Sequence, residues 1–447
     1  MAVTTYWSPN QTAQTQVETY TFTAPSSVGN TYTATINGKT VTYTSVSGDT
    51  ATTVATAMFN LLNATTSVPP ELTEITWANP SAGVVTATAR EAGTPFANVT
   101  INGVTGLGLV MTTGNGLANG IATAHTTANK SPSDVADAQN WLRVDLATTP
   151  PNRIRATPQN TDDVVVANTS VPMLWNLDHL SAVQFNTYQR FQSFTGTIGL
   201  PETNEGGYAE WRATYFKFSG PAGSVPAGGL AMTLGAGTGG GPSRERYDLG
   251  SSRYTLTVIA AGSAADDFGI RILGQHTLNT FTLLGAASLG IATGDGEKAN
   301  LSSSTVDGGA TLGIGPNVTW TAASTLTMLG GAASLYAAPA TLTLSNGAQV
   351  TFLQDGLTWS TITAQGGCLL TWLAGGTITT LTMTTGCTLD KSGDLRGLTI
   401  TNSTIDGDSC QFNDPNNVIT WTNATSVKQQ VSGGPFIFTG TRTVKVT

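Results

Sequence analysis

Charged side chains are scarce in this chain: Asp, Glu, Lys and Arg make up 10% of its 447 residues, against about a quarter in ordinary globular proteins. Between residues 299 and 389 the only formally charged side chains are Asp307 and Asp355. Acid–base catalysis needs ionisable groups, so this tract is poorly suited to chemistry. The net charge is −8 and no basic stripe is present, which argues against a nucleic-acid partner.

Histidine and cysteine are also rare. The chain has three histidines, which are widely separated and have no cysteine or carboxylate at ligand or triad spacing: His125, His179 and His276. It has three cysteines, spaced roughly one coil of a repeat apart: Cys368, Cys387 and Cys410. An odd number of cysteines without a nearby histidine argues against a zinc site and a disulfide framework. We therefore expect no metal and no cofactor, and a stack of small buried side chains at the cysteines.

Long apolar runs are missing as well. The first residues lack the basic and apolar segments of a secretory signal. No run approaches the roughly 18 apolar residues of a membrane helix. We expect a chain that is synthesised in a cytoplasm without a signal peptide and that has no membrane contact.

What the chain does contain is a repeat. Short segments in which apolar and small polar residues alternate recur roughly every 16–20 residues and are followed by turns rich in Gly or Asn: 325–329, 341–344, 361–364, 381–384 and 398–401. Short strands at a steady spacing are typical of a solenoid, in which each coil of chain stacks on the one before it. At about 4.8 Å per coil, roughly nine coils would form a rod about 40 Å long.

Residues 1–105 predict a separate α+β module. Two alternating segments, 31–36 and 39–44, flank Asn37-Gly38, a pair that favours the tight turn of a β-hairpin. Asp49 is a candidate cap for a helix that runs to about Asn63. Further alternating segments at 17–22, 72–77 and 83–89 complete a small sheet that this helix should cover.

The remaining chain divides by composition. Residues 106–137 are rich in Gly, Thr and Ala and are expected to form a linker. Residues 138–253 concentrate aromatic residues and are expected to cap the start of the solenoid. Residues 254–425 would form its coils, and residues 426–447 a β cap or a subunit contact. The predicted fold is therefore mainly β: a small α+β module, a parallel β-helix and a β C-terminal cap.

Two sets of residues are candidates for a functional site. Five aspartates lie in the last coils, where neighbouring coils can bring Asp390 or Asp394 close to Asp406 or Asp408 as in a glycosidase: Asp390, Asp394, Asp406, Asp408 and Asp414. The competing interpretation is solvated turns, in which aspartate is common. The second set combines aromatic and charged residues suited to a sugar, although an ordinary solvated loop fits it too: Tyr208, Glu210, Trp211 and Arg212.

Two segments resemble known motifs. The hairpin at 32–43, followed by Ser47-Gly48-Asp49, is similar to a segment that recurs in phage structural proteins. Asn140-Trp141 together with residues 161–165 resembles the opening of parallel β-helices, with Thr161 in place of a glycine. The whole chain resembles virion surface proteins of the head-fibre, capsid-decoration and tailspike type.

This resemblance implies a homotrimer on the surface of a virion, in contact with other capsid or tail proteins and with a host surface glycan. It implies no catalytic residue. The leading function from the sequence is a structural virion protein without catalysis, and the second is a tailspike that cuts polysaccharide with the aspartates of the last coils. A third, a bacterial surface adhesin, is disfavoured by the missing export signal.

Overall fold

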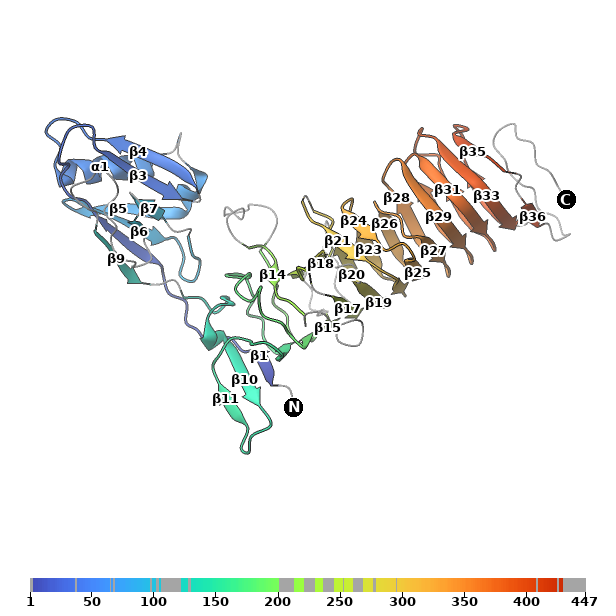
Figure 1. The fold of residues 1–447 in the computed structure, drawn as a ribbon, viewed down its shortest axis with the longest axis horizontal. Helices are drawn as coiled ribbons and strands as arrows, with labels where there is room; N and C mark the ends of the chain where they lie inside the picture. The colour runs from blue at the N-terminus through green and yellow to red at the C-terminus, as the bar shows by residue number, and fades with distance from the viewer. Residues whose placement is uncertain are drawn as a thin grey trace.

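The computed structural model describes residues 3–36, 38–64, 66, 69–96, 99–101, 104–105, 122–127, 130–200, 213–220, 230–235, 245–251, 253–259, 268–275, 279–294, 296–406, 409–423 and 426–428. Strands make up 47% of the structure and helices 6%. A parallel β-solenoid of about ten coils occupies residues 163–421, and a small module stands beside its first coils (Figure 1). The predicted combination of a small module and a parallel β-helix is confirmed.

The module has its own hydrophobic core, separate from that of the solenoid. One antiparallel sheet has the order β5-β6-β2-β9, and the other has the order β4-β3-β7-β8. The strands are β2 (Val17–Thr21), β3 (Thr31–Ile36), β4 (Lys39–Thr44), β5 (Ile75–Ser81), β6 (Val84–Ala89), β7 (Val99–Ile101), β8 (Val104–Thr105) and β9 (Ala122–Thr127). Because β9 pairs with β2, the module extends into the stretch expected to be a linker.

The local predictions for the module agree closely with its structure. β3 and β4 form the expected hairpin, in which Ile36 pairs with Lys39. Helix α1 (Ala51–Leu62) packs against β4, β5 and β6. Its N-cap is Thr50 rather than Asp49, and the Asp49 carboxylate instead accepts a hydrogen bond from the Tyr43 hydroxyl at 2.6 Å. The short 3-10 helix η1 (Pro70–Glu74) leads into β5.

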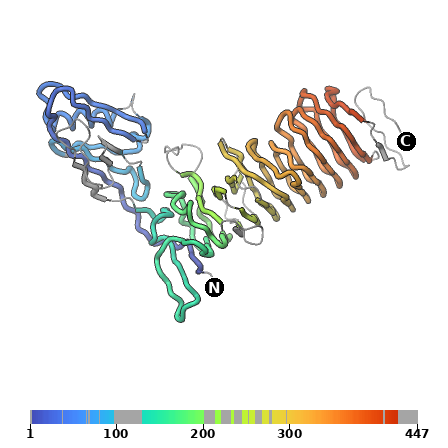
Figure 2. The backbone as a smooth tube through the Cα atoms, in the orientation of Figure 1, coloured from blue at the N-terminus to red at the C-terminus, as the bar shows by residue number. Residues whose placement is uncertain are grey.

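The first strand of the chain belongs to the solenoid and not to the module. β1 (Thr4–Trp7) lies between β10 (Trp141–Asp145), to which it is antiparallel, and β12 (Asp163–Val166), to which it is parallel. β10 follows the short 3-10 helix η2 (Ala138–Asn140) and forms a hairpin with β11 (Asn152–Ile154). The chain therefore leaves the solenoid after β1, builds the module and returns at β10 (Figure 2).

One long sheet runs the length of the solenoid. Its described strands have the order β11-β10-β1-β12-β13-β15-β17-β19-β22-β25-β27-β29-β31-β33-β35, with β36 also paired to β33. The strands not yet defined are β13 (Thr187–Arg190), β15 (Leu230–Gly235), β17 (Tyr254–Ile259), β19 (Thr280–Leu284), β22 (Ser304–Asp307), β25 (Thr325–Leu329), β27 (Thr341–Leu344), β29 (Leu357–Ala364), β31 (Gly376–Met383), β33 (Leu398–Asp406), β35 (Ile419–Trp421) and β36 (Ser426–Lys428).

A second parallel sheet faces the long one. Its described strands are β14 (Phe216–Lys217), β16 (Glu245–Asp248), β18 (Ile270–Leu273), β20 (Ser288–Ile291), β23 (Thr311–Ile314), β26 (Ala332–Leu335), β28 (Gln349–Phe352), β30 (Leu369–Trp372), β32 (Thr388–Asp390) and β34 (Gln411–Asn413), in that order. A third face begins with β21 (Ala299–Leu301) and β24 (Val318–Trp320). In later coils it is formed by the first halves of β29, β31 and β33.

The five repeats predicted from the sequence lie on adjacent strands of the long sheet, from β25 to β33. One alignment differs from the simple repeat. Leu398 pairs with Gly376, and it is Ser403 that pairs with Leu381. The reason is that β31 and β33 each span two faces of the solenoid, so one strand carries two alternating segments. The coils begin inside the region that was expected only to cap the solenoid, because β12, which follows Thr161 and Asp162, already pairs in parallel with β1 and β13.

The outer surface of the long sheet carries a continuous row of threonines. Each of these residues pairs in register with the next, one on every strand from β15 to β33: Thr233, Thr257, Thr282, Thr305, Thr327, Thr343, Thr363, Thr382 and Thr404. Their apolar neighbours point inwards and are buried. β-branched threonine suits a half-exposed pleated surface, which explains the alternation seen in the sequence.

Large side chains fill the interior of the first coils. Phe185, Tyr188, Phe216 and Phe218 pack as one aromatic cluster, with the Phe185 and Phe218 ring centroids 4.6 Å apart. Further along, Phe352, Trp359 and Trp372 form a second buried aromatic cluster, with the Phe352 and Trp372 ring centroids 4.1 Å apart. Cys368, Cys387 and Cys410 are free and buried, and each directly precedes a strand of the second sheet (β30, β32 and β34), so they stack as the sequence predicts.

Candidate functional site

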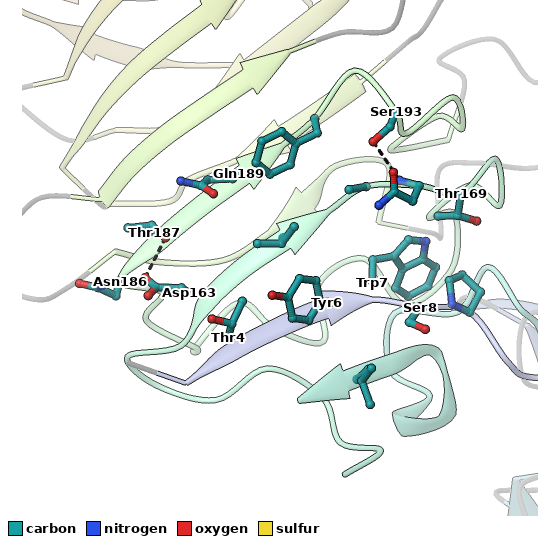
Figure 3. A pocket seen from close by; sticks show the side chains of 16 residues that line it. Thr4, Tyr6, Trp7, Ser8, Asp163, Thr169, Asn186, Thr187, Gln189 and Ser193 are labelled. Atoms are coloured by element: carbon teal, nitrogen blue, oxygen red, sulfur yellow. Dashed lines mark hydrogen bonds between the residues drawn. The ribbon is translucent and has the colours of Figure 1, made fainter. Parts of the chain in front are cut away.

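A shallow groove with a volume of about 1060 Å³ lies on the outer surface of the long sheet at the start of the solenoid (Figure 3). Its floor and walls come from β1, β12, β13 and the segments that follow them. Pairing in register brings Tyr6 beside Val165 and Val165 beside Gln189. Residues far apart in the sequence therefore form one surface, which is why the sequence alone did not reveal this site.

The middle of the groove is apolar and aromatic. Half-buried Val165 and Ala167 lie on β12 and directly after it, between the two aromatic side chains. Tyr6 is 38% exposed and Phe191 is 49% exposed, so both rings present a free surface. Trp7, the neighbour of Tyr6, points the other way and is buried, and its indole Nε1 donates to the Val171 carbonyl at 3.1 Å.

Both ends of the groove are polar. At one end, the Asp163 carboxylate accepts hydrogen bonds from Asn186 Nδ2 at 2.7 Å and from Thr187 Oγ1 at 2.8 Å. At the other end, the Asn168 backbone amide donates to Ser193 Oγ at 3.1 Å. Asp163 is the single charged side chain in the lining, and it already has two partners.

Several exposed polar groups in the groove remain free for a ligand. Among the described residues, the Tyr6 hydroxyl and the Gln189 amide have no hydrogen-bond partner. They lie in one row across the strands, on either side of Val165. The site therefore offers uncharged hydrogen-bond donors and acceptors beside two exposed aromatic rings.

Buried polar contacts fix the strands beneath the groove. Asp162 accepts from Thr5 Oγ1 at 2.7 Å and from Arg143 Nε at 3.0 Å, which ties β1 and β10 to the start of β12. Asn140 Nδ2 donates to the Ser131 and Asp134 carbonyls. Thr161 has a φ of 69°, a conformation that favours glycine. The segments that resemble a β-helix opening are thus the structural base of this site.

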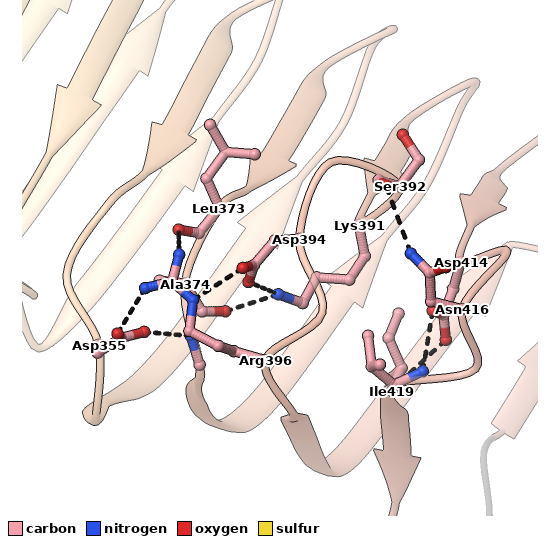
Figure 4. Close-up of polar contacts among 12 residues, drawn as sticks. Asp355, Leu373, Ala374, Lys391, Ser392, Asp394, Arg396, Asp414, Asn416 and Ile419 are labelled. Atoms are coloured by element: carbon pink, nitrogen blue, oxygen red, sulfur yellow. Dashed lines mark hydrogen bonds and ion pairs between the residues drawn. The ribbon is translucent and has the colours of Figure 1, made fainter.

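The aspartates of the last coils do not form a pair of free carboxylates. Asp394 forms ion pairs with Lys391 and Arg396, and Arg396 also binds Asp355 (Figure 4). Lys391 is buried, and its Nζ donates to the Ala374 carbonyl at 2.8 Å. Burial alone would raise the pKa of Asp394, but hydrogen bonds from Lys391 and Arg396 outweigh it and lower that pKa. A general acid needs the opposite shift.

The other candidate aspartates are placed as turn residues. The Asp390 carboxylate accepts from Ser392 Oγ at 2.7 Å and from Asn413 Nδ2 at 3.0 Å. Asp406 ends β33 on the long sheet, whereas Asp390 ends β32 on the second sheet. Asp408 lies outside the described residues. The expected closeness of Asp390 or Asp394 to Asp406 therefore receives no support from the strand arrangement.

The proposed sugar-binding set at Tyr208, Glu210, Trp211 and Arg212 lies outside the described residues. Within the part of the chain that is described, no group of His, Cys, Asp and Glu is arranged to hold a metal ion. The helices of that part are too short or too polar to span a bilayer.

No protein-family model matches this sequence, and no curated protein matches it either. The fold and the groove therefore have to be interpreted from their own chemistry.

Proposed function

We propose that this chain is a non-catalytic structural protein of a phage virion surface, such as a head fibre, a capsid decoration or a tail fibre, which attaches to the particle and stabilises it. The observation that carries the proposal is the long, nearly uncharged solenoid, whose acidic side chains near residue 394 are tied into ion pairs. Such a body offers shape and stability, and the ion-paired Asp394, whose pKa is lowered, is not poised to act as a general acid.

The solenoid has the physical properties that a particle surface requires. Its parallel ladders pair the backbone groups of successive coils, so few of these groups are left for water or protease. Its core is continuous from the first coils to the last. Proteins built this way resist unfolding kinetically, which suits an exposed and long-lived particle.

We further propose that the rod works as a homotrimer in contact with other capsid or tail proteins. Exposed apolar side chains recur near the same ends of strands in the long sheet: Ile259 is 41% exposed and Leu329 is 39% exposed. Leu284 pairs with Ile259, and Asp307 pairs with Leu329, so the row carries three apolar side chains and one carboxylate. The adjoining threonines have few rotamers, so burying them between copies costs little conformational entropy.

A tailspike that cuts polysaccharide is the alternative. The ion pairs of Asp394 disfavour it, and an assay separates the two functions. Purified protein would be incubated with host capsule or lipopolysaccharide, and new reducing ends would be measured. We expect none, whereas release that disappears in Asp394→Ala or Asp406→Ala would establish the alternative.

The virion proposal itself is tested by the protein composition of purified phage particles. Particles of the phage that carries this gene would be purified on a density gradient and analysed by mass spectrometry. Peptides of this chain should follow the major capsid protein through the gradient at a constant ratio. Their absence from intact particles would refute the proposal.

A further inference from the structure

The groove formed by β1, β12 and β13 has a lining that is almost free of charge. Its sixteen lining residues include no lysine, arginine or histidine, and Asp163 is the single acidic one. Anions are bound in proteins by cations or by clustered amide donors. A sulfated or carboxylated ligand would find no cation here and would approach the Asp163 carboxylate.

The groove exposes both aromatic faces and polar groups, and a sugar can contact both. Tyr6 and Phe191 offer aromatic faces on either side of Val165 and Ala167. The C–H face of a sugar ring packs on such aromatic surfaces, and its edge carries hydroxyls. The Tyr6 hydroxyl and the Gln189 amide, which have no partner among the described residues, can both donate and accept hydrogen bonds.

We propose that this groove binds an uncharged oligosaccharide, with sugar rings packed against Tyr6 and Phe191 and hydroxyls bonded to Gln189, Asn168 and the Tyr6 hydroxyl. A volume of about 1060 Å³ accommodates a few sugar rings. Such a site would let the proposed virion protein attach to a host. The glycan-binding proposal rests on the virion proposal only for the claim that the glycan comes from a host surface.

The lining also explains why a sugar fits better than a peptide or a second copy. An apolar docking surface would bury its polar atoms, and this groove has amide and hydroxyl groups at both ends and in its middle row. Hydroxyls of a neutral glycan can replace the waters at these groups, so the hydrogen bonds of the groups are kept.

The test uses the full-length protein and two opposed sets of probes. Neutral malto-, cello-, chito- and manno-oligosaccharides would be immobilised beside polygalacturonate and heparin fragments, and binding would be measured by biolayer interferometry. We expect binding to at least one neutral probe and none to the acidic probes. Tyr6→Ala and Phe191→Ala should each weaken it by about tenfold, since each removes an aromatic contact.

Tyr336→Ala is the matched control, because Tyr336 is 37% exposed, close to the 38% of Tyr6, but lies outside the groove. It should bind as the unmodified chain does. Binding to no neutral probe, a preference for acidic probes, or binding that survives both groove substitutions would overturn the proposal. A change of molecular mass in Tyr6→Ala by light scattering, without a change in glycan binding, would assign the groove to a second copy instead.

The glycan-binding test and the test of the virion proposal can fail independently. Glycan binding by a protein absent from particles would remove only the virion role. A particle protein that binds no neutral glycan would remove only the role of the groove.

Discussion

Trp7 packs edge to face against Trp141, with ring centroids 4.9 Å apart. Both indoles are buried in the solenoid core. This contact joins the first strand of the chain to the strand that follows the module, and it closes the open end of the solenoid. The extreme N-terminal strand is thus part of the rod and supports the groove above it.

Trp7→Ala should destabilise the solenoid by about 3 kcal/mol, because it removes a fully buried indole and leaves a cavity. The measurement is the free energy of unfolding in guanidinium chloride. Tyr6→Ala is the control. The Tyr6 side chain is partly exposed, so this substitution should lower the free energy of unfolding by less than about 1 kcal/mol. Equal effects of the two substitutions would mean that β1 does not close the core.

Thr161→Gly should stabilise the protein by about 1 kcal/mol. Thr161 is a β-branched residue at φ 69°, a conformation that costs roughly 1–2 kcal/mol for a side chain with a Cβ. Glycine removes this strain, although the greater freedom of its unfolded chain offsets part of the gain. Thr257→Gly, in the middle of β17, is the control and should destabilise. A loss of stability in both variants would contradict the strained geometry.

The ion pair between Lys391 and Asp394 should make stability depend on acid pH. The pKa of Asp394 is lowered in the folded protein, so its contribution is complete above the unfolded value near 3.9 and is lost as pH falls through the folded value. Asp394→Asn should therefore cost about 2 kcal/mol at pH 7, and this cost should shrink as the pH falls below the unfolded pKa of the carboxyl group. The two unfolding free energies would be compared by urea titration at each pH.

Asp178→Asn is the control for that experiment, because Asp178 is exposed and distant from the network. It should leave stability within about 0.5 kcal/mol at every pH. If the Asp394→Asn difference is the same at pH 7 and pH 2, the carboxylate is not held by charge.

Ile259→Asp and Leu329→Asp should each break the proposed trimer, because each places a charge in an apolar contact between copies. Molecular mass would be measured by light scattering coupled to size exclusion. Leu395→Asp is the control: Leu395 is 74% exposed and lies away from the long sheet, so the trimer should persist. A monomer before any substitution would refute the assembly.

The repeats of the sequence predicted the solenoid because local alternation and spacing determine which residues of each coil face inwards. They did not place β1, whose partners β10 and β12 are distant in the sequence and whose four residues carry little pattern of their own. Long-range pairing of this kind also created the groove, since Tyr6 and Phe191 line the same surface only because β1 pairs with β12.

For the candidate catalytic aspartates, the sequence predicted where the residues lie along the chain but not which charged groups surround them. Sequence spacing placed Asp394 near other acidic residues, but it did not show that Lys391 would be buried against it. The charge environment of a carboxylate depends on which loops of neighbouring coils meet. Arg396 reaches Asp355 from a coil further along the chain, and no local pattern encodes that contact.

The central claim is that this rod stands on the outside of a virion, and labelling of intact particles tests it most directly. Antibodies raised against the purified protein would be coupled to gold and added to unbroken particles before electron microscopy. We predict label at regular positions on the head or tail surface. Particles that stay unlabelled while the same antibodies detect the chain in infected cells would contradict the account.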